Sequence, residues 1–321
     1  MTTLAKPLSL LTLATALCTA CSAGTSPSAS AMSSLAESAS AGSVSASANP
    51  SQSLPAISEG RIAFSSERDG DSEIYLAGAD GSLINLTNDP AQDSQPAWSP
   101  DGTHLVFASD RTGSSELYVI GADGTGLQQV SDGLANDGFP AWSPDGARIA
   151  FASDRDGNAE IYVMNADGTD LTRLTNDPNN DLAPAWSPDG TRIAFDRDIG
   201  GTNFDVYLMN ADGTGAVALA AGPASDESPA WSPDGSRIAF FSDRDGDFEI
   251  YAMQADGSAV APLTDDPGDD VAPAWSPDGS QLAFVGTRDG NEEVYVMEAD
   301  GSDVRRLTAD PADDGDPAWT S

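Results

Sequence analysis

The chain has 321 residues, with 51 Asp plus Glu against 14 Lys plus Arg, so its formal net charge is −37. This balance excludes the basic surface that nucleic-acid binding requires. The chain contains two Cys and one His, so disulfide scaffolds, Cys/His zinc sites and most His-dependent catalysis lack the residues they need. After residue 58, no stretch free of Gly and Pro exceeds 11 residues, which excludes long helices and predicts an all-β protein.

Residues 1–20 predict a secretory signal peptide. An apolar stretch from Leu8 to Leu17 precedes small residues, and it is about half as long as a membrane-spanning helix. The sequence Cys18-Thr19-Ala20-Cys21 resembles the lipobox of bacterial lipoproteins, in which the modified Cys becomes the new N-terminus. We therefore expect Cys21 to carry lipid and to anchor an extracytoplasmic protein, periplasmic or at the cell surface. Signal cleavage without lipidation, which would release a soluble secreted protein, is the alternative.

Residues 22–57 predict a disordered tether. They are mostly Ser and Ala, with some Gly and Pro, one charged residue (Glu37) and no aromatic residue. Such a segment cannot bury enough apolar surface to offset the entropy lost on ordering. The folded part of the chain is therefore expected to span residues 58–321.

Residues 58–321 repeat one unit six times. Each unit has one Trp and one Tyr, and successive Trp residues are 44 or 45 positions apart, at 98, 142, 186, 231, 275 and 319. Within one unit, from Pro140 to Asp181, four short apolar runs are separated by Ser-Pro-Asp-Gly, Asp-Arg-Asp-Gly and Asn-Ala-Asp-Gly turns. Four antiparallel strands per unit, repeated six times, predict a six-bladed β-propeller.

The two ends of the repeat region predict that the ring closes. The first unit begins at its second strand, Arg61 to Phe64, whereas the chain ends with a surplus Trp-bearing strand, Pro317 to Ser321. We expect this C-terminal strand to join the first blade. That pairing would remove the exposed edge between the first and last blades.

The recurring motifs Trp-Ser-Pro-Asp-Gly, Ile-Ala-Phe, Ser-Asp-Arg-Asp-Gly and Glu-Ile-Tyr-Val-Met-Asn-Ala-Asp-Gly resemble the WD-repeat-like propeller repeats of the TolB family. The resemblance covers residues 60–321. It implies a propeller that binds other molecules in the cell envelope. TolB also has an N-terminal α/β domain before its propeller, where this chain has the Ser/Ala-rich segment.

The connections of an antiparallel blade alternate between two faces. One face carries the Pro-Asp-Gly and Ala-Asp-Gly turns, and we name it the turn face. The other, the link face, carries the Arg-Asp-Gly hairpins and the links into each Trp strand. An Asp lies five residues before every Trp on this face, and we predict that the six carboxylates ring the channel mouth and bind a cation or cationic ligand: Asp93, Asp137, Asp181, Asp226, Asp270 and Asp314. The alternative is that each Asp caps its own loop as an Asx turn.

The link-face hairpins carry oxygen donors at alternating positions. The segment from Asp154 to Glu160 superficially resembles a calcium loop, but it lacks the full twelve-position pattern. A hairpin in which Arg155 pairs with Glu160 explains the same residues. We therefore predict no cofactor, and bound calcium remains the alternative.

Several residues deviate from the repeat. His104 takes the place of an Arg in other units and is interpreted as a surface substitution, whereas the Trp and Tyr residues are predicted to form the core. The fourth unit is one residue longer between Phe195 and Asp205, and Asp205 replaces the usual Glu. Phe139, among other aromatic residues outside the consensus, lies beside the link-face loops and hints at a contact surface.

No nucleophile with a neighbouring base can be recognised, so we predict that the protein is not an enzyme. The sequence favours an exported, lipid-anchored monomeric scaffold that binds an envelope protein or a small ligand. A hydrolase or lyase that acts on sugars or peptides through an acidic channel mouth is the alternative, because paired carboxylates can perform acid–base chemistry. Adaptation to a saline habitat is a separate explanation for the acidity.

Overall fold

The computed structural model describes residues 60–200 and 203–320. The predicted signal peptide (1–20), the lipidation site Cys21 and the tether (22–57) lie outside these residues. Within the described part of the chain, no helix is long and apolar enough to cross a membrane.

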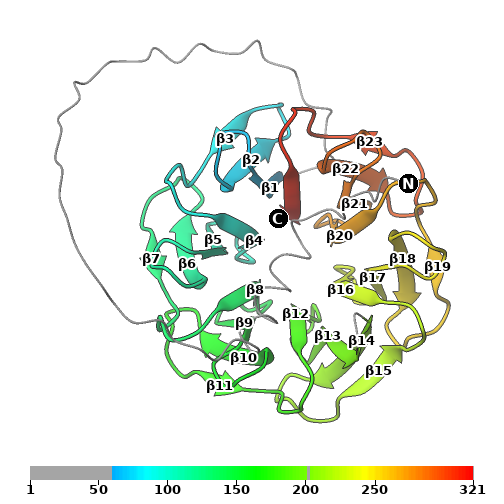
Figure 1. Ribbon diagram of the computed structural model, residues 1–321, viewed down its shortest axis with the longest axis horizontal. Helices are drawn as coiled ribbons and strands as arrows, with labels where there is room; N and C mark the ends of the chain where they lie inside the picture. Colours follow the sequence, from blue (N-terminus) through cyan, green and yellow to red (C-terminus); the bar gives the residue numbers. More distant parts are fainter. Residues whose placement is uncertain (1–59, 201–202, 321) are drawn as a thin grey trace, which may run out of the picture.

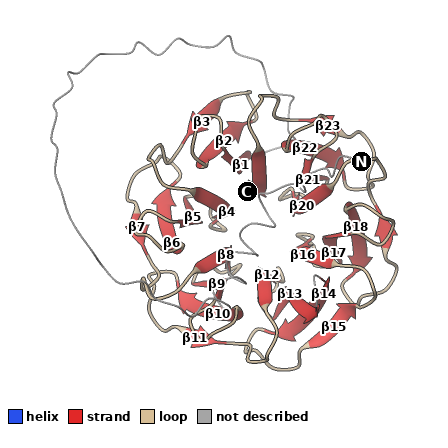
Figure 2. Cartoon of the chain, viewed as in Figure 1, coloured by secondary structure: helices blue, strands red, loops and turns tan. Residues whose placement is uncertain are grey.

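Six four-stranded antiparallel sheets are arranged as blades around a central channel (Figure 1). Figure 2 shows that the described chain consists of strands joined by loops and turns. The predicted all-β, six-bladed propeller is confirmed. From the channel outward the blades are β24 (Asp314–Trp319), β1 (Arg61–Ser66), β2 (Glu73–Gly78) and β3 (Leu83–Asn85); β4 (Asp93–Trp98), β5 (His104–Ser109), β6 (Glu116–Gly121) and β7 (Gln128–Gln129); β8 (Asp137–Trp142), β9 (Arg148–Ser153), β10 (Glu160–Asn165) and β11 (Thr172–Arg173); β12 (Asp181–Trp186), β13 (Arg192–Gly200), β14 (Asn203–Asn210) and β15 (Val217–Ala220); β16 (Asp226–Trp231), β17 (Arg237–Ser242), β18 (Glu249–Gln254) and β19 (Ala261–Pro262); β20 (Asp270–Trp275), β21 (Gln281–Gly286), β22 (Glu293–Glu298) and β23 (Arg305–Arg306).

The C-terminal strand closes the ring, as predicted. Strand β24 pairs antiparallel with β1, and its register places Trp319 opposite Ile62 and Asp314 opposite Ser66. The Trp319 ring packs in a cluster that contains Phe64 of the first blade and Val294 of the sixth. The first and last repeats are therefore joined by backbone pairing and by a shared core.

The hydrophobic core lies between neighbouring blades. Trp186 of the fourth blade packs against Ile161 and Val163 of the third, and the other clusters repeat this arrangement. Within each blade the Tyr ring lies beside a Phe ring, as in Phe151 and Tyr162, whose centroids are 6.0 Å apart. The prediction that Trp and Tyr form the core is confirmed.

The Ala-Asp-Gly turns bring the backbone of one blade against that of the preceding blade. Gly168 has a φ of +87°, and a Cβ atom built on it would lie 2.3 Å from the Val130 carbonyl oxygen. An L-residue would meet both unfavourable backbone torsion and a steric clash at this position. Glycine therefore permits the close approach of the second and third blades.

Candidate functional site

The six predicted site aspartates occupy equivalent places, at the first residue of each innermost strand. Their side chains are at most 2% exposed. Each carboxylate accepts a hydrogen bond from an arginine on the link-face hairpin of the same blade; in the second blade, Arg111 Nη2 donates to both Asp93 oxygens at 2.9 Å. The pairs are Arg68–Asp314, Arg111–Asp93, Arg155–Asp137, Arg197–Asp181, Arg244–Asp226 and Arg288–Asp270.

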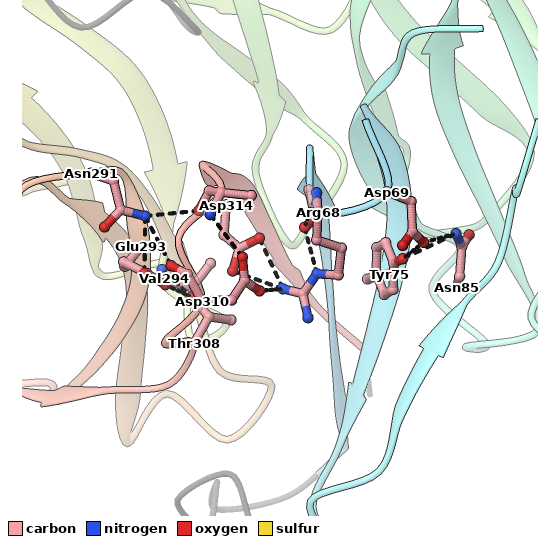
Figure 3. A network of polar contacts seen from close by, with 12 residues as sticks. Arg68, Asp69, Tyr75, Asn85, Asn291, Glu293, Val294, Thr308, Asp310 and Asp314 are labelled. Atoms are coloured by element: carbon pink, nitrogen blue, oxygen red, sulfur yellow. Dashed lines mark hydrogen bonds and ion pairs between the residues drawn. The ribbon is translucent and has the colours of Figure 1, made fainter. Parts of the chain in front are cut away.

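Each of these guanidinium groups is held by several contacts. Arg111 lies 4.6 Å from the centroid of the Tyr118 ring, and it also forms an ion pair with a second carboxylate, Asp89, at 3.0 Å. Figure 3 shows the corresponding group in the first blade, where Arg68 points toward Asp310 and Asp314. The arginine therefore fixes the link to the start of the innermost strand.

Burial and the arginine act on the buried carboxylates in opposite directions. Removal from water favours the neutral acid, whereas the guanidinium favours the carboxylate. Burial has the larger effect, so it raises the pKa of Asp181 and of Asp314 to about 6 and that of Asp270 to about 7. A role of the six aspartates in binding an added cation or ligand stays a prediction, because the structure shows only that each already has an arginine partner.

The expected pairing of Arg155 with Glu160 is wrong. Arg155 Nε donates to Ser153 Oγ at 2.9 Å, so the side chain folds back along its own strand. Ser153 lies opposite Asp137 in the register, which brings the guanidinium to that carboxylate. Glu160 pairs with Arg173 at 2.8 Å instead.

The hairpin that resembled a calcium loop has its own hydrogen bonds. Asp154 accepts bonds from the backbone N–H and the side-chain amide of Asn136, at 2.9 and 2.8 Å. Among residues 60–200 and 203–320, no group of three or more His, Cys, Asp or Glu side chains is placed to hold a metal ion.

The channel mouth is lined by residues two positions after the predicted aspartates. A β-bulge in each innermost strand gives this residue a positive φ, between 47° and 55°, and the next residue is proline. The mouth has a volume of about 160 Å³ and is lined by Gln95, Phe139, Ala183, Ser228, Ala272, Asp316 and the prolines that follow them. Sequence reasoning identified Phe139 alone, although a proline two residues before every Trp was visible in all six units.

Three consecutive mouth residues are linked by hydrogen bonds across blades. The backbone N–H of Gln95 donates to Asp316 Oδ2 at 3.2 Å, and Gln95 Oε1 accepts the backbone N–H of Phe139 at 2.8 Å. Ser65 Oγ also donates to Asp316, at 3.1 Å. Burial raises the pKa of Asp316. These bonds fix one side of the mouth.

On the opposite side of the ring, two acidic residues that do not themselves line the mouth break the repeat. Asp196 stands where other blades have Ser65, Ala108, Ala152, Phe241 or Val285. Its Oδ2 accepts the backbone N–H of Ser228 at 2.9 Å, and its buried Oδ1 has no hydrogen-bond partner among the described residues.

Glu227 of the fifth blade lies close enough to affect Asp196. Burial, and then the charge of Glu227, raise the pKa of Asp196, whereas burial raises the pKa of Glu227 to about 7. Each carboxyl group therefore holds a proton more readily than an ordinary carboxyl group, which is a property that general acid–base chemistry requires. The fourth blade also has the longest strands, β13 with nine residues and β14 with eight.

Comparisons with known proteins agree with this architecture. The sequence matches the family described as TolB beta propeller domain over residues 38–137, 127–204, 182–266 and 261–321. TolB from Acinetobacter baumannii is 25% identical with a TM-score of 0.73, and the match covers 84% of this chain and 68% of that one. The putative TolB from Agrobacterium tumefaciens is 28% identical with a TM-score of 0.63, and the match covers 78% of this chain and 89% of that one.

An oligogalacturonate lyase from Vibrio parahaemolyticus is more distant. It is 16% identical with a TM-score of 0.56, and the match covers 80% of this chain and 76% of the lyase, so the likeness shows the fold alone. No curated protein sequence gives a significant match.

Proposed function

Because the chain belongs to the TolB β-propeller domain family, we propose that it is a protein-binding scaffold of the cell envelope rather than an enzyme. We further propose that it is exported, anchored through lipid on Cys21, and monomeric. The likeness to TolB structures and the signal-like residues 1–20 support an extracytoplasmic location.

The observation that carries this proposal is the combination of equivalent backbones and different side chains at the channel mouth. Six bulges present six residues at equivalent positions of the blades, yet an aromatic ring (Phe139), an amide (Gln95) and a carboxylate (Asp316) lie beside two alanines and a serine. Such a surface is asymmetric although the framework is nearly sixfold. The hydrogen bonds among Gln95, Phe139 and Asp316 hold it in shape, which lowers the entropy lost on binding.

The size of the mouth favours a protein partner over a whole small molecule. Its volume is about 160 Å³, whereas pockets that enclose drug-sized ligands are about 300–1,000 Å³. A side chain or loop tip fits the mouth, and the rest of the partner would then lie on the link face around it.

The test is capture of a partner from envelope extract with the immobilised chain, using Phe139→Asn to alter the mouth. Asn tolerates a positive φ, so the bulge should be kept while the ring is lost. Val217→Asn is the matched control, because Val217 is 55% exposed on the outermost strand β15 and does not line the mouth. We expect a stoichiometric partner with the wild type and the control, and its loss with Phe139→Asn. Equal capture by both variants would contradict binding at the mouth.

A hydrolase or lyase is the second candidate, and the Asp196–Glu227 pair is the observation in its favour. Both carboxyl groups have raised pKa values, and Ser228, which is bonded to Asp196, lines the mouth. Turnover of oligosaccharides or peptides that Asp196→Asn abolishes, with folding intact by circular dichroism, would favour this candidate over the scaffold.

A further inference from the structure

A groove lies on the turn face between the second and third blades, away from the channel mouth. It has a volume of about 660 Å³. Its floor includes Val119, Val130 and the partly buried ring of Trp142, and His104 and the turn residue Asp145 stand at its side. The groove therefore joins an aromatic surface to a negatively charged rim.

Of the five other junctions between blades, four show what covers the Trp ring, and the fifth has Gln281 at the arginine position, bonded to Glu298. In each of the four, an arginine at the start of the second strand of one blade lies over the Trp of the next blade, at 4.6–5.0 Å from the ring centroid. The pairs are Arg61–Trp98, Arg148–Trp186, Arg192–Trp231 and Arg237–Trp275. Arg237 also donates to the carbonyl oxygen of Ala299, in the Ala-Asp-Gly turn of the next blade, at 3.1 Å.

His104 occupies this arginine position at the groove. Its side chain is exposed, and Nδ1 lies 2.8 Å from the hydroxyl of the neighbouring Thr103. The cation–π contacts of the described residues include none between His104 and Trp142. The junction thus keeps the Trp ring of an arginine site but does not supply the arginine.

The remaining parts of the arginine site are present. Ala166, which corresponds to Ala299, lines the groove with its turn neighbour Asp167. Asp101, Asp145 and Asp167 each hold their own turn through Oδ1, and these hydrogen bonds lower their pKa values, so the rim is ionised at neutral pH.

We propose that this groove binds an arginine side chain of a partner protein, with the guanidinium stacked on Trp142, hydrogen-bonded to the Ala166 carbonyl and facing the carboxylates of the rim. The chain itself cannot readily supply that residue. Residues 1–59 contain Lys6 but no Arg. Of the 13 arginines, six pair with the buried aspartates and four cover Trp rings, while Arg173 and Arg306 pair with Glu160 and Glu293, which leaves Arg305.

The probe is the peptide acetyl-Gly-Arg-Gly-amide, titrated into the full chain while the six indole N–H signals are followed by NMR. We expect the Trp142 signal, assigned with Trp142→Phe, to shift saturably at millimolar peptide while the other five stay in place. The same peptide with citrulline, which keeps the shape but lacks the charge, should give no saturable shift.

Two variants make the test specific to the groove. His104→Arg supplies the missing arginine and should reduce peptide binding at least tenfold, with an unfolding temperature equal to or above that of the wild type. His104→Gln leaves the groove open and should bind as the wild type does. Absence of a selective Trp142 shift, equal binding of the citrulline or a lysine peptide, or unchanged binding by a folded His104→Arg protein would each overturn the proposal. The citrulline comparison uses wild-type protein and so does not depend on any variant folding.

Discussion

Ring closure can be tested with a single Trp substitution. Trp319 is 9% exposed and packs between the first and sixth blades. A Trp side chain buries about 150–250 Å², and at about 25 cal/mol per Å² this corresponds to about 4–6 kcal/mol. Large-to-small substitutions in cores agree with this range, so Trp319→Ala should lower the free energy of unfolding by about 3–5 kcal/mol. For a domain of this size the unfolding temperature should fall by about 6–20 °C.

Trp231→Ala is the matched control for this prediction. Trp231 is 8% exposed and packs between the fourth and fifth blades, in the middle of the chain. In a closed ring the two Trp residues occupy equivalent places in the core and differ in that Arg192 also covers the Trp231 ring, so the two variants should unfold within a few degrees of each other, with Trp231→Ala the less stable, when followed by circular dichroism. If Trp319→Ala unfolds like the wild type while Trp231→Ala is destabilised, the ring is open in solution and the reasoning is refuted.

Three further predictions concern the ion pairs, the acidity and the turns. Arg155→Ala leaves the buried Asp137 carboxylate without its cation and should cost about 3–5 kcal/mol in urea denaturation; a change below about 1 kcal/mol would contradict an essential pair. Burial raises the pKa of Asp181 from 3.8 to about 6, so at pH values between these two the folded state binds more protons than the unfolded chain. The unfolding temperature should therefore rise as pH falls from 7.5 to 5. A fall in the unfolding temperature over this range would contradict the raised pKa. Gly168→Ala should lower the free energy of thermal unfolding by more than about 1–2 kcal/mol, because a steric clash adds to the backbone strain. Gly157→Ala is the control, since Gly157 has a positive φ but no atom near the added Cβ, and it should lower the free energy of unfolding by less. Equal losses in the two variants would argue against the clash.

The fold could be predicted because the repeat is read directly from the sequence. One Trp and one Tyr recur in every unit at spacings of 43 to 45 residues together with the turn motifs, and the first unit lacks the strand that the chain end supplies. Each observation depends on local residue types. The pairing of β24 with β1 followed from counting strands, without any knowledge of distances.

The lining of the channel mouth could not be predicted in the same way. Side chains of a regular strand alternate between faces with a period of two, but a bulge adds one residue and changes which residue faces the channel. The six bulge residues share no side-chain type, so only the proline that follows them marks the position. The aspartate that recurs in every unit forms a buried pair with an arginine, whereas the residues that vary between units line the mouth.

The partners of the arginines were also beyond sequence reasoning. Arg155 could reach either Asp137 or Glu160 by its position on the hairpin, and the bond to Ser153 decides between them. The aromatic–arginine contact between blades was missed for a related reason, since Arg148 and Trp186 are far apart in the repeat and meet only when the blades are stacked.

The proline-marked bulge separates what supports the propeller from what it presents. A residue at this position must accept a left-handed backbone, and its side chain lines the opening, so each replacement alters one sixth of the opening. Duplicated units can therefore diverge at this position while they keep the same strand order, and the hydrogen bonds among Gln95, Phe139 and Asp316 couple three of the six places. A combinatorial library limited to Gln95, Phe139, Ala183, Ser228, Ala272 and Asp316 would explore new binding specificities on an unchanged scaffold.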